Sequence, residues 1–350
     1  MTNSLMETPG KRRLWRVGLL VVVVVLGLGG LATFEHRSLS ESIASFGHLD
    51  WGWVATAVAA EAASMAAFAR VQRKLLRAGG SDVHLRSVMA VTYAGNAISV
   101  SLPLAGSEVA AAFSFRQFRR HGIESAVVGW ALALSGVISS FAFALVLAAG
   151  AVTSGSLTGA LVGLAGAMLS LAPATLILLA LRFQQVRRRL NRILAWLVEQ
   201  SIRRFGKPGA EAALVLEDFL ERVASLRLPR LELIEVFLLA LWNWVADCLC
   251  LAAAIRATGT SVPWEGLFLA YCLGMTAGSI GLTPGGLGVI EVALSAALVA
   301  VGMSSHRALA AVLVYRVISF WAVMMVGWVV MAVISRHRSP RPVSSVEPAD

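Results

Sequence analysis

Six long apolar runs constrain this chain more than any other feature of its sequence. Each approaches or exceeds the ~20 residues that a helix needs to cross a hydrocarbon core about 30 Å thick. Only 14% of the residues are charged and 57% are hydrophobic, which excludes a soluble globular domain. The sequence therefore predicts an all-α polytopic membrane protein with spans at Leu14–Phe34, Trp51–Ala69, Ile123–Ala149, Leu157–Leu181, Leu231–Ile255 and Ala308–Ile334.

Basic residues beside these runs predict the orientation of the chain. The first run is preceded by Lys11, Arg12, Arg13 and Arg16, and the last is followed by Arg336, His337, Arg338 and Arg341. Because basic residues near span ends stay in the cytoplasm, we expect both termini there. Residues 1–13 then form a cytoplasmic N-terminus, 14–335 the membrane domain and 336–350 a disordered tail. Three lysines against 27 arginines indicate a bacterial genome rich in G and C, and hence a bacterial inner membrane.

Two further apolar stretches are broken in the middle. Ser87–Phe115 is interrupted at Pro103 and has basic residues on both sides, which predicts a re-entrant hairpin that enters from the cytoplasm. Its second limb, Glu108–Phe115, would reach only ~12 Å. The stretch at 264–303 is interrupted at Pro284 and is either a deep hairpin entering from outside or two crossing helices.

The order of spans and breaks predicts an inverted repeat. The second and third runs flank the Pro103 hairpin, and the fifth and sixth flank the Pro284 hairpin with the opposite orientation. The breaks also look alike, since "SLPLAGSEVA" and "LTPGGLGVIEVA" each have proline, then glycine, then Glu-Val-Ala. Many transporters have inverted repeats with broken helices, and their substrate sites lie where the breaks meet.

Two glutamates follow the breaks and are candidate substrate-binding residues. Glu291 should lie about two turns into the helix after Pro284, and Glu108 has the matching place after Pro103. A charge at the bilayer centre costs roughly 2.5–3.5 kcal/mol on insertion scales, so such residues usually face a cavity or a partner. The alternatives are a glutamate near an interface, or one that merely pairs with Arg316.

Three other ionisable residues stand inside predicted spans. Arg316 lies ~12 Å into the last span, where it either pairs with Glu291 or holds a phosphate. Asp247, one turn after Asn243, is a candidate cavity liner or proton carrier. Glu61 lies among small residues, which favours an interhelical hydrogen bond.

The motif "TPGGLG" suggests a backbone site for an anion. Glycines before a helix let main-chain N–H groups approach a ligand, and a helix N-terminus favours negative charge. A lipid phosphate would suit that position, which makes candidate binding residues of Pro284, Gly285, Gly286 and Gly288. The alternative is a simple Pro-Gly turn.

The cytoplasmic loop at 182–230 contains the amphipathic segment "QQVRRRLNRILAWLVEQSIRRF". Its basic face includes Arg187, Arg188 and Arg192, which we expect to lie on the anionic membrane surface. Nucleic-acid binding would also explain the charge, but the hydropathy argues against it. No metal or cofactor is expected, because the three cysteines lack metal-ligand spacing and no HExxH, Walker or GxSxG motif is present.

Three segments resemble the lysylphosphatidylglycerol synthase transmembrane region family of flippase-like membrane proteins: "LTPGGLGVIEVALSAALVAVG", "VYRVISFWAVMMVGWV" and "NAISVSLPLAGSEVAAAFSFRQFRRHGI". The resemblance implies an inner-membrane protein that moves aminoacylated phospholipids or lipid-linked sugars between leaflets. It also implies that the proline and glycines of "TPGGLG", Glu291 and Arg316 are motif positions. The first hairpin departs from the commoner pattern, with Leu104, Ala105 and Ala111 where arginines are usual.

The leading hypothesis is a lipid transporter rather than an enzyme. Its partners would be membrane lipids, and a separate protein would carry any lipid-modifying activity, since no soluble synthase domain is present in this sequence. A scaffold subunit and a membrane-embedded transferase are the alternatives. The transported lipid, the energy source and the oligomeric state are left open by the sequence.

Overall fold

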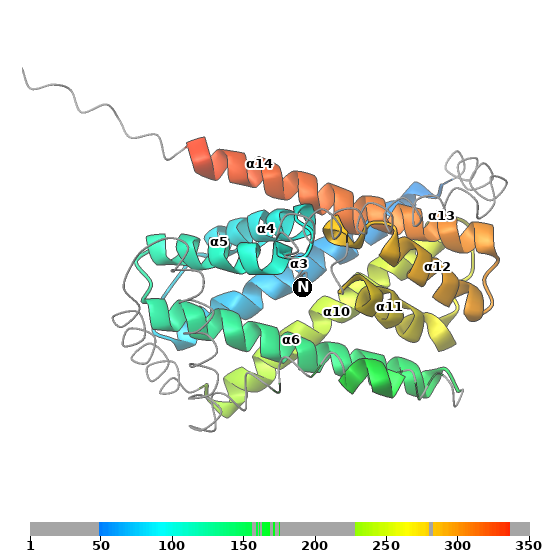
Figure 1. The fold of residues 1–350 in the computed structure, drawn as a ribbon, viewed down its shortest axis with the longest axis horizontal. Coiled ribbons are helices and arrows are strands. Elements are labelled where there is room, and N and C mark those ends of the chain that lie inside the picture. The colour runs from blue at the N-terminus through cyan, green and yellow to red at the C-terminus, as the bar shows by residue number, and fades with distance from the viewer. Residues whose placement is uncertain are drawn as a thin grey trace, which may run out of the picture.

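A computed structural model describes residues 49–155, 159, 161, 163–168, 171, 175, 228–279 and 283–336 of the chain. All regular structure in these residues is helical (Figure 1). The predicted span Leu14–Phe34, most of Leu157–Leu181, nearly all of the loop at 182–230 with its three surface arginines, and residues 337–350 lie outside the described residues.

Four helices within the described residues are long and apolar enough to cross a membrane. They are α3 (Trp51–Ala78), α6 (Ser125–Thr153), α10 (Arg230–Ala257) and the continuous helix Ser305–Arg336. The last comprises α13 (Ser305–Arg316), the π-helical segment η3 (Val317–Ala322) and α14 (Val323–Arg336). Four of the predicted spans therefore correspond to helices of spanning length.

Helix α3 continues nine residues past the apolar run predicted to end at Ala69. The extension carries Arg70, Arg73, Lys74 and Arg77, and these residue types favour helix nearly as strongly as leucine does. Asp50 caps the start of the helix by accepting a hydrogen bond from the Gly52 N–H at 2.9 Å. The end of the apolar run therefore does not mark the end of the helix.

The first broken stretch forms the helical hairpin of α4 (Leu85–Ser101) and α5 (Gly106–Arg120). Two close approaches show that the helices run antiparallel. A Cβ at Gly106 would lie 2.0 Å from the carbonyl oxygen of Ser99, and a Cβ at Gly95 would lie 3.1 Å from Ser114 Oγ. Our expected second limb was too short. The helix continues to Arg120 and reaches ~22 Å instead of ~12 Å.

The second broken stretch forms a hairpin of α11 (Trp264–Gly278) and α12 (Val289–Ala300), with the single 3-10 turn η2 (Pro284–Gly286) between them. Glycines let the two helices pack closely: a Cβ at Gly274 would lie 2.9 Å from Leu294 Cβ, and one at Gly278 would lie 2.5 Å from Ile290 Cδ1. With 15 and 12 residues, each helix is too short to cross a membrane alone.

Helices α3 and α10 form an antiparallel pair at the centre of the molecule (Figure 1). The Asp50 N–H donates to the Ala257 carbonyl at one end, at 3.0 Å, and Lys74 pairs with Glu235 near the other. Between them Asn243 Nδ2 donates to Ser64 Oγ at 2.7 Å. Helix α6 packs against both members of this central pair.

Each hairpin packs its first helix on the last long helix of the other half of the chain. Helix α4 lies along α14, where a Cβ at Gly327 would be 2.3 Å from the Tyr93 carbonyl oxygen. Helix α11 lies along α6, where a Cβ at Gly150 would be 2.5 Å from the backbone nitrogen of Leu269 (Figure 1). In both contacts the first helix of one half's hairpin packs on the last long helix of the other half.

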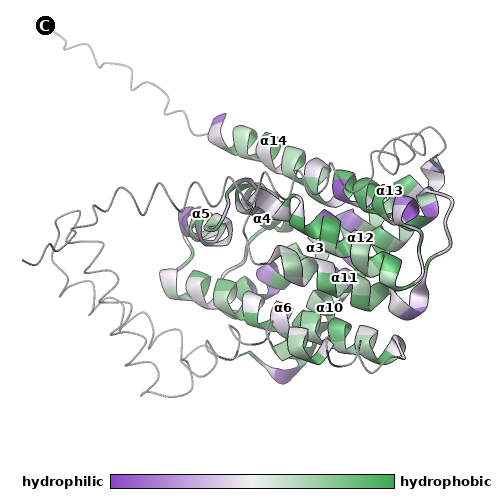
Figure 2. Ribbon diagram, turned by 45° about the vertical axis from the view of Figure 1, so that its right-hand side comes forward, coloured by the Kyte–Doolittle hydropathy of each residue, from purple (hydrophilic) through white to green (hydrophobic). Residues whose placement is uncertain are grey.

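The outer surface is apolar as well as the core. Figure 2 shows hydrophobic ribbon along most of the helices, with hydrophilic residues mainly at the ends of α5, α13 and α14 and at a few interior positions. Helices that are hydrophobic all round are typical of membrane spans. Exposed large apolar side chains include Val58, Phe141, Leu145, Leu238, Trp242, Met325, Val329 and Val333.

Candidate substrate-binding site

The break of the second hairpin packs against the first hairpin. Helix α4, which precedes the Pro103 break, contacts η2 at Pro284–Gly286. The predicted site residues Pro284, Gly285 and Gly286 therefore lie beside the first hairpin. Irregular backbone at membrane depth is tolerated where protein surrounds it, and this arrangement provides such surroundings.

The glycine turn has a backbone conformation that other residues rarely adopt. Gly285, Gly286 and Gly288 have φ angles of 56°, 67° and 81°. Glycine adopts positive φ at no steric cost, whereas a side chain would strain the turn. The turn is closed by Thr283, which accepts from the Gly286 N–H through its carbonyl at 3.1 Å and donates its hydroxyl to the Leu287 carbonyl at 2.8 Å.

Glu291 and Arg316 form a buried ion pair beside this turn. Arg316 Nε donates to Glu291 Oε1 at 2.6 Å, and the two side chains are only 8% and 9% exposed. The other carboxylate oxygen, Oε2, accepts from the Gly288 N–H at 2.7 Å. Glu291 thus caps α12 and occupies the helix N-terminus where we expected a phosphate.

Arg316 also holds the glycine turn through two further contacts. Its Nη2 donates to the Gly285 carbonyl at 2.8 Å, and its guanidinium lies 4.3 Å from the centroid of the Phe320 ring. The Phe320 ring in turn packs on Gly285, where a Cβ would lie only 2.0 Å from Phe320 Cε2. Hydrogen bonds and a cation–π contact therefore fix one deep arginine in place.

Glu108 matches Glu291 in its position along the helix but not in its surroundings. Each is the third residue of the helix that follows the break, in α5 and α12 respectively. Glu291 is buried, whereas Glu108 is exposed and accepts a hydrogen bond from Ser107 Oγ at 3.0 Å. The structure brings Glu291, Arg316 and the glycine turn together and leaves Glu108 outside this cluster.

Asp247 belongs to a second polar cluster, which sequence reasoning found only in part. Its two oxygens accept hydrogen bonds from Tyr271 at 2.6 Å and from Tyr315 at 2.9 Å, and its carboxyl group also hydrogen-bonds with that of Glu61. The tyrosines were not predicted as site residues. The chain has only three tyrosines, so their presence within apolar runs was a signal that could have identified them.

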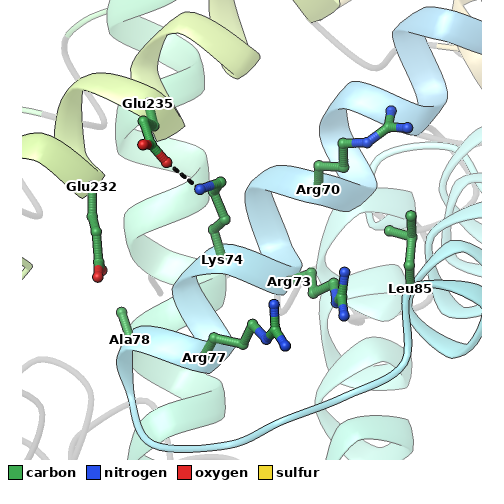
Figure 3. A pocket seen from close by; sticks show the side chains of 8 residues that line it. All are labelled: Arg70, Arg73, Lys74, Arg77, Ala78, Leu85, Glu232 and Glu235. Atoms are coloured by element: carbon green, nitrogen blue, oxygen red, sulfur yellow. Dashed lines mark hydrogen bonds and ion pairs between the residues drawn. The ribbon is translucent and has the colours of Figure 1, made fainter.

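A basic depression lies at the opposite end of α3 from Asp50. It has a volume of about 460 Å³ and is lined by Arg70, Arg73, Lys74, Arg77, Ala78, Leu85, Glu232 and Glu235 (Figure 3). Among the residues that the structure describes, three of the four cations already have partners: Lys74 pairs with Glu235, Arg77 Nε donates to Asp82 at 2.7 Å, and Arg73 Nε donates to the Val83 carbonyl at 2.9 Å. The Arg77–Asp82 contact is a charge-assisted hydrogen bond. The hydrogen bond from Arg77 lowers the pKa of the exposed Asp82 carboxyl. Four cations against two acids make the depression attractive to anionic headgroups.

The family model of the lysylphosphatidylglycerol synthase TM region matches residues 15–327 of this chain. The chain belongs to that family. It is accordingly an integral, multi-pass membrane protein, as its helices of spanning length also indicate. The resemblance stated from the sequence is therefore confirmed. The matched region contains both hairpins, the glycine turn and the Glu291–Arg316 pair.

A curated relative with sequence similarity is the UPF0104 membrane protein of Methanothermobacter thermautotrophicus. It is 32% identical to this chain over 92 residues, which are 26% of this chain and 28% of the relative. The similarity thus spans less than a third of that relative's length, and the relative's name describes a membrane protein without stating an activity.

Proposed function

We propose that this protein transports a polar-headed lipid between the leaflets of a bacterial inner membrane, with both of its termini in the cytoplasm. The observation that carries the proposal is the packing of the η2 break against helix α4 of the first hairpin, beside the buried Glu291–Arg316 pair. A buried ionisable pair next to broken helices is the arrangement in which transporters of inverted-repeat design hold their substrates. Membership of the lysylphosphatidylglycerol synthase TM region family supports a role that involves lipids.

We further propose that α3–α6 and α10–α14 are the two halves of an inverted repeat. Each half begins with one helix of the antiparallel central pair, continues with a hairpin and ends with a long helix. The exchange of packing between the halves, α4 on α14 and α11 on α6, is what a twofold axis in the membrane plane would produce. The two breaks would then lie on either side of that axis.

The ion pair favours a headgroup that carries both charges. Glu291 and Arg316 satisfy each other, so a lipid that engages one of them must replace its partner. Removing one partner of a buried pair typically costs about 3–5 kcal/mol, because the remaining charge is uncompensated. An aminoacylated phospholipid offers an ammonium group to Glu291 and a phosphate to Arg316, whereas a lipid-linked sugar offers mainly the phosphate.

The test is lipid exchange in liposomes that contain the purified full-length protein. Fluorescent lipids with anionic, zwitterionic and aminoacylated headgroups are followed by dithionite quenching, for the wild type and for the variants Glu291→Gln, Arg316→Gln and Glu291→Gln/Arg316→Gln. We expect headgroup-selective exchange by the wild type and none by any variant. The double variant is decisive because it removes both charges and leaves neither unpaired.

Exchange at the wild-type rate by the double variant would assign the pair to folding alone. If the wild type moves no lipid of the panel and no lipid-linked sugar, the transport function is wrong. In that event a scaffold role beside a separate lipid-modifying enzyme becomes the leading account. Conversion of a lipid by the purified protein would contradict our proposal that it is not an enzyme.

A further inference from the structure

Glu61 and Asp247 lie opposite each other in the middle of the central helix pair. The contacts Asp50–Ala257 and Ser64–Asn243 fix the antiparallel register of α3 and α10. In that register Glu61 is ten residues from the start of α3 and Asp247 ten residues from the end of α10, or ~15 Å along helices that are each ~42 Å long. Both carboxyl groups therefore lie deep in the membrane domain, far from either helix end.

The hydrogen bonds around the pair distinguish its two members. Asp247 accepts from two tyrosine hydroxyls, which stabilise its charged form. Glu61 is 7% exposed, and within the described part of the chain its Oε2 has no hydrogen-bond partner. Two carboxylates in contact at low dielectric strongly disfavour simultaneous ionisation, so the pair at rest holds one proton between them. Glu61 is the member left to carry it.

The groups that face the pair are few and mostly uncharged. Helix α6 and the segment Val317–Ala322, which also pack on α3, contain no titratable side chain. Three buried cysteines lie near Asp247, and burial keeps free thiols inert. Within the part of the chain that the structure describes, the remaining titratable neighbours are Tyr93 of α4, Tyr271 of α11, and Tyr315 and Arg316 of α13. Arg316 is the one cation among them, and Glu291 neutralises it.

We propose that Glu61 and Asp247 form a proton-binding site at the middle of the membrane domain. One proton binds to the Glu61 carboxylate and forms an O–H bond, so that the charge of the pair changes from −2 to −1 and no other bond is made or broken. As a second step, which rests on the proposed transport function, binding and release of this proton are coupled to lipid movement.

Infrared spectroscopy tests the site without any lipid substrate. Full-length protein in nanodiscs of phosphatidylglycerol and phosphatidylethanolamine is titrated with acid and base, and the C=O stretch of protonated carboxyl groups is recorded in H₂O and D₂O. We expect a band at neutral pH that shifts in D₂O and is lost in Glu61→Gln. Because the glutamine amide can still donate to Asp247, this variant should fold.

The matched control is Glu108→Gln, which removes an exposed carboxylate and should leave the neutral-pH band intact. If Glu61→Gln does not fold, Asp247→Asn tests the same pair, because an amide in place of the carboxylate weakens the hydrogen bond from the Glu61 O–H and the band must move. A neutral-pH band that is unchanged in the folded variant overturns the proposal. Loss of the wild-type band when sodium is added at constant pH also overturns the proposal, because the pair would then bind sodium in place of the proton.

The coupling step is tested by lipid exchange with and without a pH gradient across the liposome. We expect the gradient to accelerate exchange several-fold in the wild type and to have no effect in Glu61→Gln. If the wild type exchanges lipid at the same rate with and without the gradient, the coupling step is wrong and the proposed transport function still holds. If no lipid moves at all, the proposed function fails, and the infrared measurement still decides the proton site.

Discussion

Tyr315 and Arg316 are consecutive residues that bind two different buried carboxylates. Tyr315 donates to Asp247 of α10 at 2.9 Å, and Arg316 donates to Glu291 of α12 at 2.6 Å. The last turn of α13 thus connects the central helix pair to the second hairpin. A change at either carboxylate acts on the same turn of helix, so the two polar clusters are mechanically linked.

The Glu291–Arg316 pair should show strong non-additivity in stability. We expect Glu291→Gln and Arg316→Gln each to destabilise the protein by about 3–5 kcal/mol, since each leaves a buried charge or donor without its partner. The double variant should lose less than the sum of the two single losses. Thermal and denaturant unfolding in detergent, followed by tryptophan fluorescence, measures all three, and additive losses would contradict the pairing.

Alanine at Gly285 should disrupt the turn. The residue has a φ of 56°, and its Cβ would lie 2.0 Å from Phe320 Cε2, so we expect a loss of about 2–4 kcal/mol. Gly136→Ala is the matched control, because that helical glycine has no neighbour within 4 Å of its Cβ. The control should be neutral or stabilising by up to ~1 kcal/mol. Equal melting temperatures for the two variants would show that the turn tolerates a side chain.

Removing either tyrosine hydroxyl from Asp247 should weaken the central cluster. Hydrogen bonds to charged groups typically contribute about 1.5–3 kcal/mol, which is the loss expected for Tyr271→Phe and for Tyr315→Phe. Because both hydroxyls serve one carboxylate, the double variant should deviate from additivity. Chemical denaturation of the four proteins gives the coupling energy, and a coupling of zero would mean that the hydroxyls act independently.

The exchanged packing of the two halves predicts matched effects at two distant glycines. Gly150→Leu should force α11 away from α6, and Gly327→Leu should force α4 away from α14, each at a cost of about 1–3 kcal/mol or more. Gly136→Leu on the exposed face of α6 should cost nothing. Thermal unfolding of the three variants makes the comparison. Damage at one contact without damage at the other would argue against equivalent halves.

Features set by local sequence were predictable, and those set by register between distant helices were not. The length of the apolar runs identified the long helices. Because few charged residues lie deep in these runs, an ion pair between Glu291 and Arg316 was one of the predicted alternatives, and the structure contains that pair. Sequence position paired Glu108 with Glu291, yet burial separates them, because exposure depends on which helix covers each hairpin. The contacts of Asp247 with Tyr271 and Tyr315 required three helices to align, and no local pattern specifies that alignment.

The π-helical segment Val317–Ala322 follows directly after Arg316. A π-turn holds one more residue than an α-turn, and such wide turns often mark functional positions in long helices. If the wide turn moved toward the N-terminus past Tyr315, the residues that it passed would rotate by ~100° about the helix axis. Tyr315 and Arg316 would then swing away together, and a single backbone slip would release both carboxylates at once.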